Sequence, residues 1–235
     1  SSGAPLERPL KAAVESLFDL PLHNGYGTTE CSPTIAQVRP DRPRTDCSVG
    51  PVLPGVEARL VGAAGRSVPD GEVGELWVRG PNVMKGYYRD EAQTAAAIDG
   101  EGWFNTRDLA RLESDHLFIA GRTQELIIRF GFNVYPPEVE AVLKLHAAVQ
   151  RAAVVGRQTA DGTEEIVAFV EATPGATAST SELFDHAAQH LTPYKRPSEI
   201  RWLATMPMTS GGKILKRELT AMAASARPDE PGRPS

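Results

Sequence analysis

The apolar and polar residues follow different patterns in the two parts of the chain. Up to residue 121, short runs with strand-like alternation dominate, such as "VEARLVG" and "GELWVRG", with the turn "PDGEVG" between them. From Arg122 onward, strand-like and helix-like runs alternate, which is typical of a compact α+β domain. We predict an α+β protein in which residues 1–121 contain a small β subdomain, residues 122–225 form a compact domain, and residues 226–235 form a disordered tail.

In the first part, "ERPLKAAVESLF" has apolar residues at helical spacing, so we predict a helix that ends before Asp19. "LPLHNGYG" is predicted as a short strand that runs into a glycine loop. "RDEAQTAAAI" should be a helix started by Asp90, and "LARLESDHLFIAG" a hairpin with its turn at Ser114 and Asp115.

In the second part, we predict strands at "ELIIRF", "RAAVVG", "EEIVAFVEA" and "SEIRWL". Helices are expected at "PPEVEAVLKLH", where prolines at the start cost no hydrogen bond, at "SELFDHAAQHL", capped by Ser181, and at "KRELTAMAA".

Composition excludes several classes of protein. The 235 residues are 41% hydrophobic and 23% charged, as in an ordinary globular chain. The formal net charge of −5 gives no electrostatic reason to expect a nucleic-acid partner or an anionic membrane. No apolar run reaches the roughly 20 residues that span a bilayer. Cys31 and Cys47 form no CxxC pair, so we expect a reduced, cytoplasmic protein with inert thiols.

The stretch "NGYGTTE" combines residue types that suit a nucleotide. Its glycines allow a ligand close to the backbone, and Tyr26 offers a flat face to a purine. The threonines can donate to phosphate oxygens, and Glu30 could hold magnesium together with substrate phosphates. Taken alone, however, the stretch is better explained as a glycine turn capped by threonines.

Three further residues are candidates, each with a simpler structural explanation. Asp108 in "GWFNTRDLA" could accept the two hydroxyls of a ribose, or could be a cap or a solvated turn residue. Arg122 in "GRTQELII" could bind phosphate or ribose oxygens, or form a surface salt bridge. Lys213 in "TSGGKILKREL" lies on a glycine loop and could meet an anion, but Ile214 follows it, so this is not a P-loop.

Taken in order, the motifs resemble the adenylate-forming superfamily of acyl-CoA synthetases, luciferases and peptide-synthetase adenylation domains. The matching runs extend to about Leu219 and are "GAPL", "NGYGTTE", "VGPVLPGVEARLV", "GELWVRGPNVMKGYY", "GWFNTRDLA", "GRTQELIIRFGFNVYPPEVE", "LTPYKRPSEI" and "TSGGKILKREL". "GYGTTE", and the lack of a following carrier domain, look more like an acyl-CoA ligase than a peptide-synthetase module.

The resemblance implies a role for each candidate. The implied nucleotide contacts are Gly3, Ala4 and Pro5 beside the adenine, Tyr26 stacked on it with Gly27 adjacent, and Asp108 with Arg122 at the ribose. The implied catalytic residues are Thr29 at the α-phosphate, Glu30 at magnesium, and Lys213 between the carboxylate and phosphate oxygens. Gly131 would border the tunnel for CoA, and Gln124 would be the hinge of a mobile carboxy-terminal domain.

The implied activity is an ATP-dependent carboxylic acid–CoA ligase that uses ATP, magnesium and CoA and forms an acyl-adenylate. Fatty or aromatic acids are the substrates the family suggests. Three positions depart from the family pattern: Arg107 replaces a glycine, Gln124 replaces an aspartate or lysine, and Phe130 replaces the first glycine of a pair.

The resemblance also suggests that the chain is the carboxy-terminal part of such a ligase. In the family, a Ser/Thr/Gly-rich phosphate loop precedes "GAPL", so we expect the isolated 235-residue chain to form no acyl-CoA. Two alternatives stay open. One is a non-catalytic remnant that binds a nucleotide or a partner, and the other is a carrier-linked adenylation domain.

Overall fold

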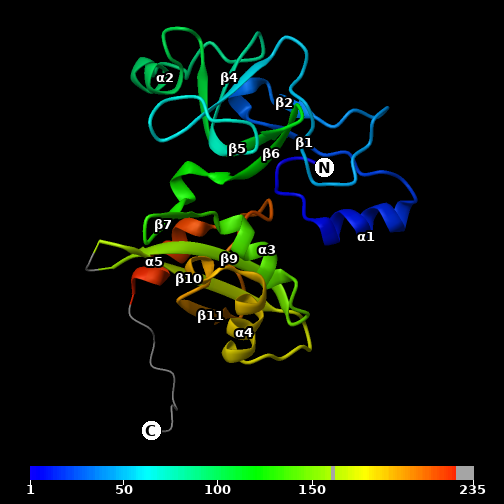
Figure 1. Ribbon diagram of the computed structural model, residues 1–235, viewed down its shortest axis with the longest axis vertical. Coiled ribbons are helices and arrows are strands. Elements are labelled where there is room, and N and C mark those ends of the chain that lie inside the picture. Colours follow the sequence, from blue (N-terminus) through cyan, green and yellow to red (C-terminus); the bar gives the residue numbers. More distant parts are fainter. Residues whose placement is uncertain (160–161, 226–235) are drawn as a thin grey trace. The chain divides into compact units, whose positions relative to one another are not determined.

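The computed structural model describes residues 1–159 and 162–225 (Figure 1). Internal contacts divide the chain into two units, Ser1–Gln124 and a second unit that starts at Glu125. Helices and separate, mostly antiparallel sheets make up both units, which matches the predicted α+β class. The tail predicted to be disordered, 226–235, lies outside the described residues.

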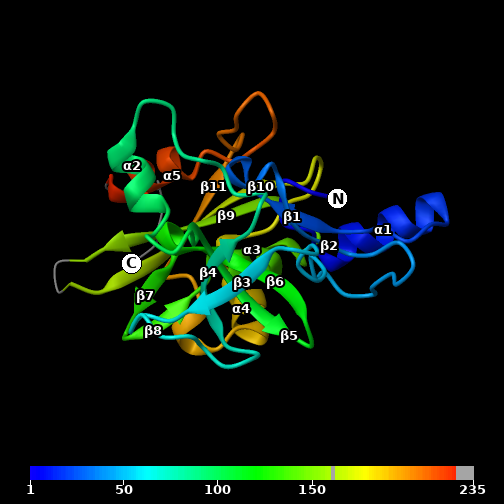
Figure 2. The same cartoon turned by 90° about the horizontal axis from the view of Figure 1, so that it is seen from above.

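The first unit is built mainly from antiparallel strands. Its elements are α1 (Arg8–Phe18), β1 (Gly25–Gly27), β2 (Thr34–Gln37), β3 (Glu57–Val61), β4 (Val73–Arg79), α2 (Glu91–Ala97), β5 (Phe104–Glu113) and β6 (His116–Arg122). Strands β3, β4, β5 and β6 form one antiparallel sheet in chain order, and β1 pairs with β2. Helices α1 and α2 lie at opposite sides of this unit (Figures 1 and 2).

Most predicted elements of this unit are confirmed. The Asp90 side chain accepts the N–H of Gln93 and so caps α2. Ser114 and Asp115 both adopt left-handed conformations, with φ of 48° and 64°, as a two-residue hairpin turn requires. The strand predicted at "LPLH" is wrong: the strand lies in the "GYG" that was expected to be a loop on composition, and it pairs with β2.

Helix α1 is present, but its apolar side faces outward. The side chains of Leu10, Leu17 and Phe18 are exposed, whereas Lys11 is buried. The Lys11 ammonium donates to the Glu15 carboxylate at 2.5 Å and to the carbonyl of Leu22 at 2.8 Å. Hydrogen bonds, rather than apolar packing, therefore hold the inner side of this helix.

The second unit is a three-stranded sheet covered by helices on both faces. Its elements are β7 (Ile127–Arg129), β8 (Phe132–Val134), α3 (Pro136–Lys144), β9 (Val149–Gln158), β10 (Glu164–Ala172), α4 (Thr180–His190), β11 (Glu199–Leu203) and α5 (Lys216–Ala224). Strand β10 lies in the centre, antiparallel to β9 and parallel to β11, and β7 pairs with β8.

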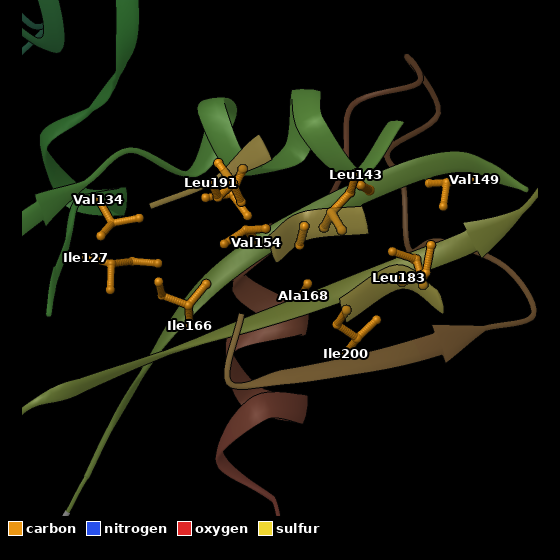
Figure 3. Close-up of a cluster of buried hydrophobic side chains, with 14 residues drawn as sticks. Ile127, Val134, Leu143, Val149, Val154, Ile166, Ala168, Leu183, Leu191 and Ile200 are labelled. Atoms are coloured by element: carbon orange, nitrogen blue, oxygen red, sulfur yellow. The ribbon is translucent and has the colours of Figure 1, made fainter. Parts of the chain in front are cut away.

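Alternating residues of the central strands explain the two-sided core. Val154, Ile166 and Ala168 point to the face covered by α3 and α4, where Leu143 and Leu183 pack (Figure 3). The intervening residues point the opposite way because strand side chains alternate. They pack against α5 in a second cluster, whose buried members are Ala153, Val155, Val167, Phe169, Met206, Leu219 and Ala223.

One predicted cap is wrong. Ser179, not Ser181, caps α4: its hydroxyl accepts the N–H of Glu182, and the Glu182 carboxylate accepts the N–H of Ser179. This reciprocal capping box satisfies two backbone donors and so places the start of the helix two residues earlier than predicted.

The structure describes the state of the cysteines and the length of the helices. Both cysteines are free thiols, and burial raises the pKa of Cys31 and Cys47, which disfavours the nucleophilic thiolate. None of the helices in residues 1–159 and 162–225 is long and apolar enough to cross a bilayer.

Candidate functional site

Three of the predicted site residues meet in the first unit. The Tyr26 hydroxyl on β1 donates a hydrogen bond of 2.5 Å to Oδ2 of Asp108 on β5. Nε of Arg122 lies 3.3 Å from Oδ1 of the same carboxylate, since Asp108 and Arg122 are cross-strand partners in the β5–β6 ladder. Asp108 is therefore the point where a phenol and a guanidinium converge.

The surroundings of Asp108 bury the residue and hold its backbone in place. Asp108 is only 7% exposed, and its backbone N–H donates to the hydroxyl of Thr106 at 3.1 Å. Thr106 in turn donates to the carbonyl of Leu76 at 2.8 Å, which ties this end of β5 to β4. The Arg122 side chain is 56% exposed, so the cluster reaches the surface on the arginine side. Thr106 was not predicted, although it stands two residues before Asp108.

The phenol of Tyr26 strongly favours its protonated form. Burial raises its pKa far above the usual value, and the negative charge of Asp108 raises it further. The phenol therefore stays protonated at neutral pH and serves as a donor. Because its hydroxyl is committed to Asp108, the ring face is the part of Tyr26 left for a ligand.

A cavity of about 300 Å³ lies along β1 and β2. Tyr26 and Gly27 line it, together with Ser1, Ser2, His23, Gly25, Pro33, Thr34 and Gln37. Gly3, Ala4 and Pro5, which were predicted at the adenine, are exposed and do not line this cavity.

The structure explains why position 27 is a glycine. A Cβ there would lie 1.8 Å from the carbonyl oxygen of Pro33, so any other residue would force β1 away from the loop before β2. The sequence suggested that a ligand comes close to this glycine, but the group that does so here is the protein's own backbone at Pro33.

Glu30 lies in a short 3-10 helix, Thr29–Cys31, that follows β1. Tyr87, which was not predicted, donates to Oε1 of Glu30 at 3.0 Å, and the N–H of Met84 donates to the carbonyl oxygen of Glu30 at 2.7 Å. Thr29 is exposed beside it.

The arrangement of possible metal ligands shows what kind of magnesium site Glu30 could form. Within residues 1–159 and 162–225, no group of three or more His, Cys, Asp or Glu side chains is arranged to hold a metal. Magnesium, however, is usually bound by one or two carboxylates with substrate phosphates and water. Glu30 therefore fits a magnesium ion that arrives with a nucleotide, and does not fit a resident metal.

Two of the three departures from the family pattern lie in left-handed backbone. Arg107 has φ of 58°, and Phe130, before Gly131, has φ of 52°. Both positions carry glycine in the pattern described above, and glycine alone adopts this conformation without steric cost. The Asn105 side chain helps to hold Arg107, accepting its N–H at 2.7 Å.

The remaining candidates lie at the end of the first unit and in the second unit. Gly131, with φ of 79°, forms the turn between β7 and β8. Gln124 is the last residue of the first unit and the middle of a 3-10 turn, Thr123–Glu125.

Lys213 is exposed on a hydrogen-bonded turn rather than on an open loop. Its N–H donates to the hydroxyl of Thr209 at 3.1 Å, and the N–H of Thr209 donates back to its carbonyl oxygen at 2.8 Å. Gly212 allows the turn to close with φ of 82°. The side chain of Lys213 is thus presented by a defined backbone.

Comparison with known proteins identifies the family of the chain. Residues 1–88 match the model of the AMP-binding enzyme family, and residues 138–213 match that of the AMP-binding enzyme C-terminal domain. The chain belongs to the AMP-binding, adenylate-forming enzyme family. The predicted resemblance is therefore confirmed.

The relatives of this AMP-binding chain are considerably longer than it is. It is 37% identical over 225 residues to 4-coumarate–CoA ligase-like 9 of Arabidopsis thaliana, covering 94% of this chain and 40% of the relative. It is also 37% identical over 218 residues to a long-chain-fatty-acid–CoA ligase of Yersinia pestis, covering 92% and 38%. The chain thus spans about two fifths of the curated relatives it matches.

Among solved structures, ATP-bound MatB from Rhodopseudomonas palustris superposes with a TM-score of 0.89 at 32% identity. The superposition covers 94% of this chain and 44% of MatB. This similarity supports the fold of both units of the AMP-binding chain.

The raised pKa of Tyr26 predicts a pH dependence of stability. Because the native pKa lies above the unfolded value of 10.0, the native state holds a proton that the unfolded chain loses at higher pH. This contribution is complete below pH 10 and is lost as pH rises, at up to about 1.4 kcal/mol per pH unit. Urea unfolding at a series of pH values should show a steeper alkaline loss for the wild type than for Tyr26→Phe. Parallel curves would contradict the assignment.

The left-handed conformation of Arg107 predicts that glycine is preferred there. Arg107→Gly should be more stable than Arg107→Ala by about 1 kcal/mol, because both remove the side chain but only glycine removes the Cβ clash. The difference between the free energies of unfolding of the two variants measures the cost of a Cβ in this left-handed conformation. Equal stability of the two variants would show that Arg107 carries no strain.

Proposed function

We propose that the complete protein containing this chain is an ATP-dependent, AMP-forming carboxylic acid–CoA ligase. The observation that carries the proposal is the convergence of Tyr26 and Arg122 on buried Asp108 in a chain of the AMP-binding family. Relatives named as 4-coumarate–CoA and long-chain-fatty-acid–CoA ligases support the choice of acceptor. Within this proposal the protein acts in the cytoplasm, on a fatty or aromatic acid.

The nucleotide would be held by the first unit. The Asp108 carboxylate has the acceptors that a ribose diol needs, and its contacts with Tyr26 and Arg122 keep it oriented before the ligand arrives. The ring of Tyr26 lines the cavity along β1, where a purine could stack on it. Thr29 and Glu30 follow directly in the chain, so they would lie toward the phosphates.

The first chemical step joins two anions. A carboxylate oxygen attacks the α-phosphorus of ATP, the bond to the β-phosphate oxygen breaks, and pyrophosphate leaves, which gives the acyl-adenylate. Cations and hydrogen-bond donors aimed at the developing charge are the main need of such a step. Lys213 is exposed on its turn and would supply a cation there. Magnesium held by Glu30, when bound, would neutralise phosphate charge.

The second step transfers the acyl group. The CoA thiol loses its proton to solvent, its sulfur attacks the acyl carbon, and the bond from that carbon to the AMP oxygen breaks, so that AMP leaves with the electron pair. Gly131 in the β7–β8 turn would border the path of the CoA arm. Gln124, between the two units, would allow the second unit to change position between the steps.

The activity is tested by incubating the complete protein with ATP, magnesium and a panel of fatty, cinnamic-type and benzoic acids. Pyrophosphate and AMP should form with one class of acid, and a thioester should appear only when CoA is added. Nucleotide binding without pyrophosphate release from any acid would instead indicate a non-catalytic remnant. Acyl transfer to a carrier protein but not to CoA would indicate a carrier-linked domain.

Lys213→Ala should slow adenylation by roughly 10²–10³-fold, by analogy with the loss of one preorganised donor. Thioester formation from supplied acyl-adenylate should change little, because the cation serves the first step. The measurements are acid-dependent pyrophosphate exchange and thioester formation, made separately. The matched control is Arg217→Ala, an exposed cation four residues along the chain. Unchanged exchange in Lys213→Ala would remove Lys213 from the mechanism.

Gln124→Pro should slow thioester formation more than adenylation in the complete protein. Proline restricts φ to about −65°, so a residue that must change conformation between the steps is held in one state. Separate rates for the two half-reactions provide the test. An equal loss in both steps, or in neither, would count against a hinge at this position.

A further inference from the structure

The second unit contains a largely buried cation that the proposed chemistry does not use. Nζ of Lys216 lies 2.6 Å from Oε2 of Glu125 and 2.7 Å from Oε1 of Glu140, and its side chain is only 20% exposed. Lys213, three residues earlier, is exposed. The two lysines of "GGKILK" therefore have opposite environments, although both stand in the same motif.

The three charged groups form a network that crosses several elements. Glu140 on α3 also accepts the N–H of Val154 on β9, at 2.9 Å. Lys216 is the first residue of α5, and Glu125 is the first residue of the second unit. The network thus joins the beginning of α5, α3, β9 and the point where the chain enters the unit.

The charge of Lys216 is retained in this setting. Burial opposes the ammonium form, but the carboxylates of Glu140 and Glu125 outweigh it and raise the pKa of Lys216. Removing the lysine would leave two carboxylates close together without a counter-ion. The geometry is therefore unlike that of an exposed ion pair, which contributes little.

The turn that carries Lys213 is attached to this network by a short path. Leu215, directly before Lys216, donates its N–H to the carbonyl of Pro207 at 2.9 Å, which closes the base of the turn. A shift of Lys216 therefore moves the base of the turn, and Lys213 with it.

We propose that Lys216 is a positioning residue. By binding Glu125 and Glu140 together, it holds the Lys213 turn in a fixed orientation relative to the residue where the chain enters the second unit. A rotation at that entry point would then carry Lys213 as part of a rigid body. The inference rests on the proposed role of Lys213 in adenylation.

The test compares variants of the complete protein. Lys216→Met removes the cation and keeps most of the length, and Lys216→Arg restores the charge. Lys216→Met with Glu140→Gln removes one of the two carboxylates as well, so that a folded variant can be obtained if the single substitution unfolds. The matched control is Arg201→Met, because Arg201 pairs with Glu199 at 2.8 Å and donates to the carbonyl of Met222 at the other end of α5.

Two readouts separate positioning from stability. Hydrogen exchange should speed up at least about tenfold at the amides of Thr209, Lys213 and Leu215 in the Lys216→Met variants, while amides of the β10–β11 ladder keep wild-type rates. The kcat of adenylation should fall about 10- to 100-fold with the KM for ATP unchanged, as expected from misplacement of a catalytic group. Lys216→Arg should recover most of both, and Arg201→Met should change neither.

The outcomes distinguish this inference from the proposed function. Wild-type exchange at the turn in the folded double variant overturns the positioning role, even if Lys213→Ala abolishes adenylation. Faster exchange throughout the second unit, with kcat unchanged in the folded fraction, also overturns it and leaves only a stabilising ion pair. If Lys213→Ala has no effect while the exchange results are as expected, the network positions the turn and the proposed role of Lys213 is wrong.

Discussion

The candidate nucleotide site depends on the hydrogen bond from Tyr26 to Asp108. The two residues are 82 positions apart and lie on different sheets, so this contact joins the short β1–β2 pair to the β3–β6 sheet. Since Asp108 is almost fully buried, its carboxylate requires the donors that Tyr26 and Arg122 provide. In the proposed function the same contacts would also orient the carboxylate for a ligand, so one arrangement would serve both stability and binding.

The backbone around this contact is under similar constraint. Gly27 allows β1 to approach the Pro33 carbonyl closely, and Arg107 is left-handed directly before Asp108. Strain next to a functional carboxylate is common, because the surrounding structure can hold a residue in a conformation that it would not otherwise adopt. The Asn105 side chain and the β5 ladder supply that support for Arg107.

Much of the fold could be predicted from local pattern. The β5–β6 hairpin, the helices α2, α3 and α5, and the central strand β10 follow from alternation, caps and turn residues, which are local properties. The pairing of β1 with β2 and the outward apolar side of α1 could not be predicted in this way. They depend on contacts with distant segments, such as the carbonyl of Leu22 that Lys11 binds.

The candidate site also contains some features that the sequence predicted and others that only the structure shows. The ordered motifs identified Tyr26, Asp108 and Arg122 from residue type, and the structure adds the direct contacts between them. Tyr87 at Glu30 and Thr106 at Asp108 were not predicted, because tyrosine and threonine at these positions carry no distinctive signal in one sequence. Only the three-dimensional structure shows that Tyr87 donates to the Glu30 carboxylate and that the Thr106 hydroxyl accepts the backbone N–H of Asp108.

The two lysines of "GGKILK" show why burial decides what a charge can do. Lys213 is exposed, so a charged ligand can reach its ammonium from solvent. Lys216 has already exchanged water for two carboxylates, so a ligand would have to break both ion pairs before binding it. The sequence alone does not distinguish the two lysines, whereas their environments favour the proposed catalytic role for Lys213 and the proposed positioning role for Lys216. The closeness of the two in the chain then has a physical meaning, because a rigid anchor is most effective when it lies next to the group that must be placed.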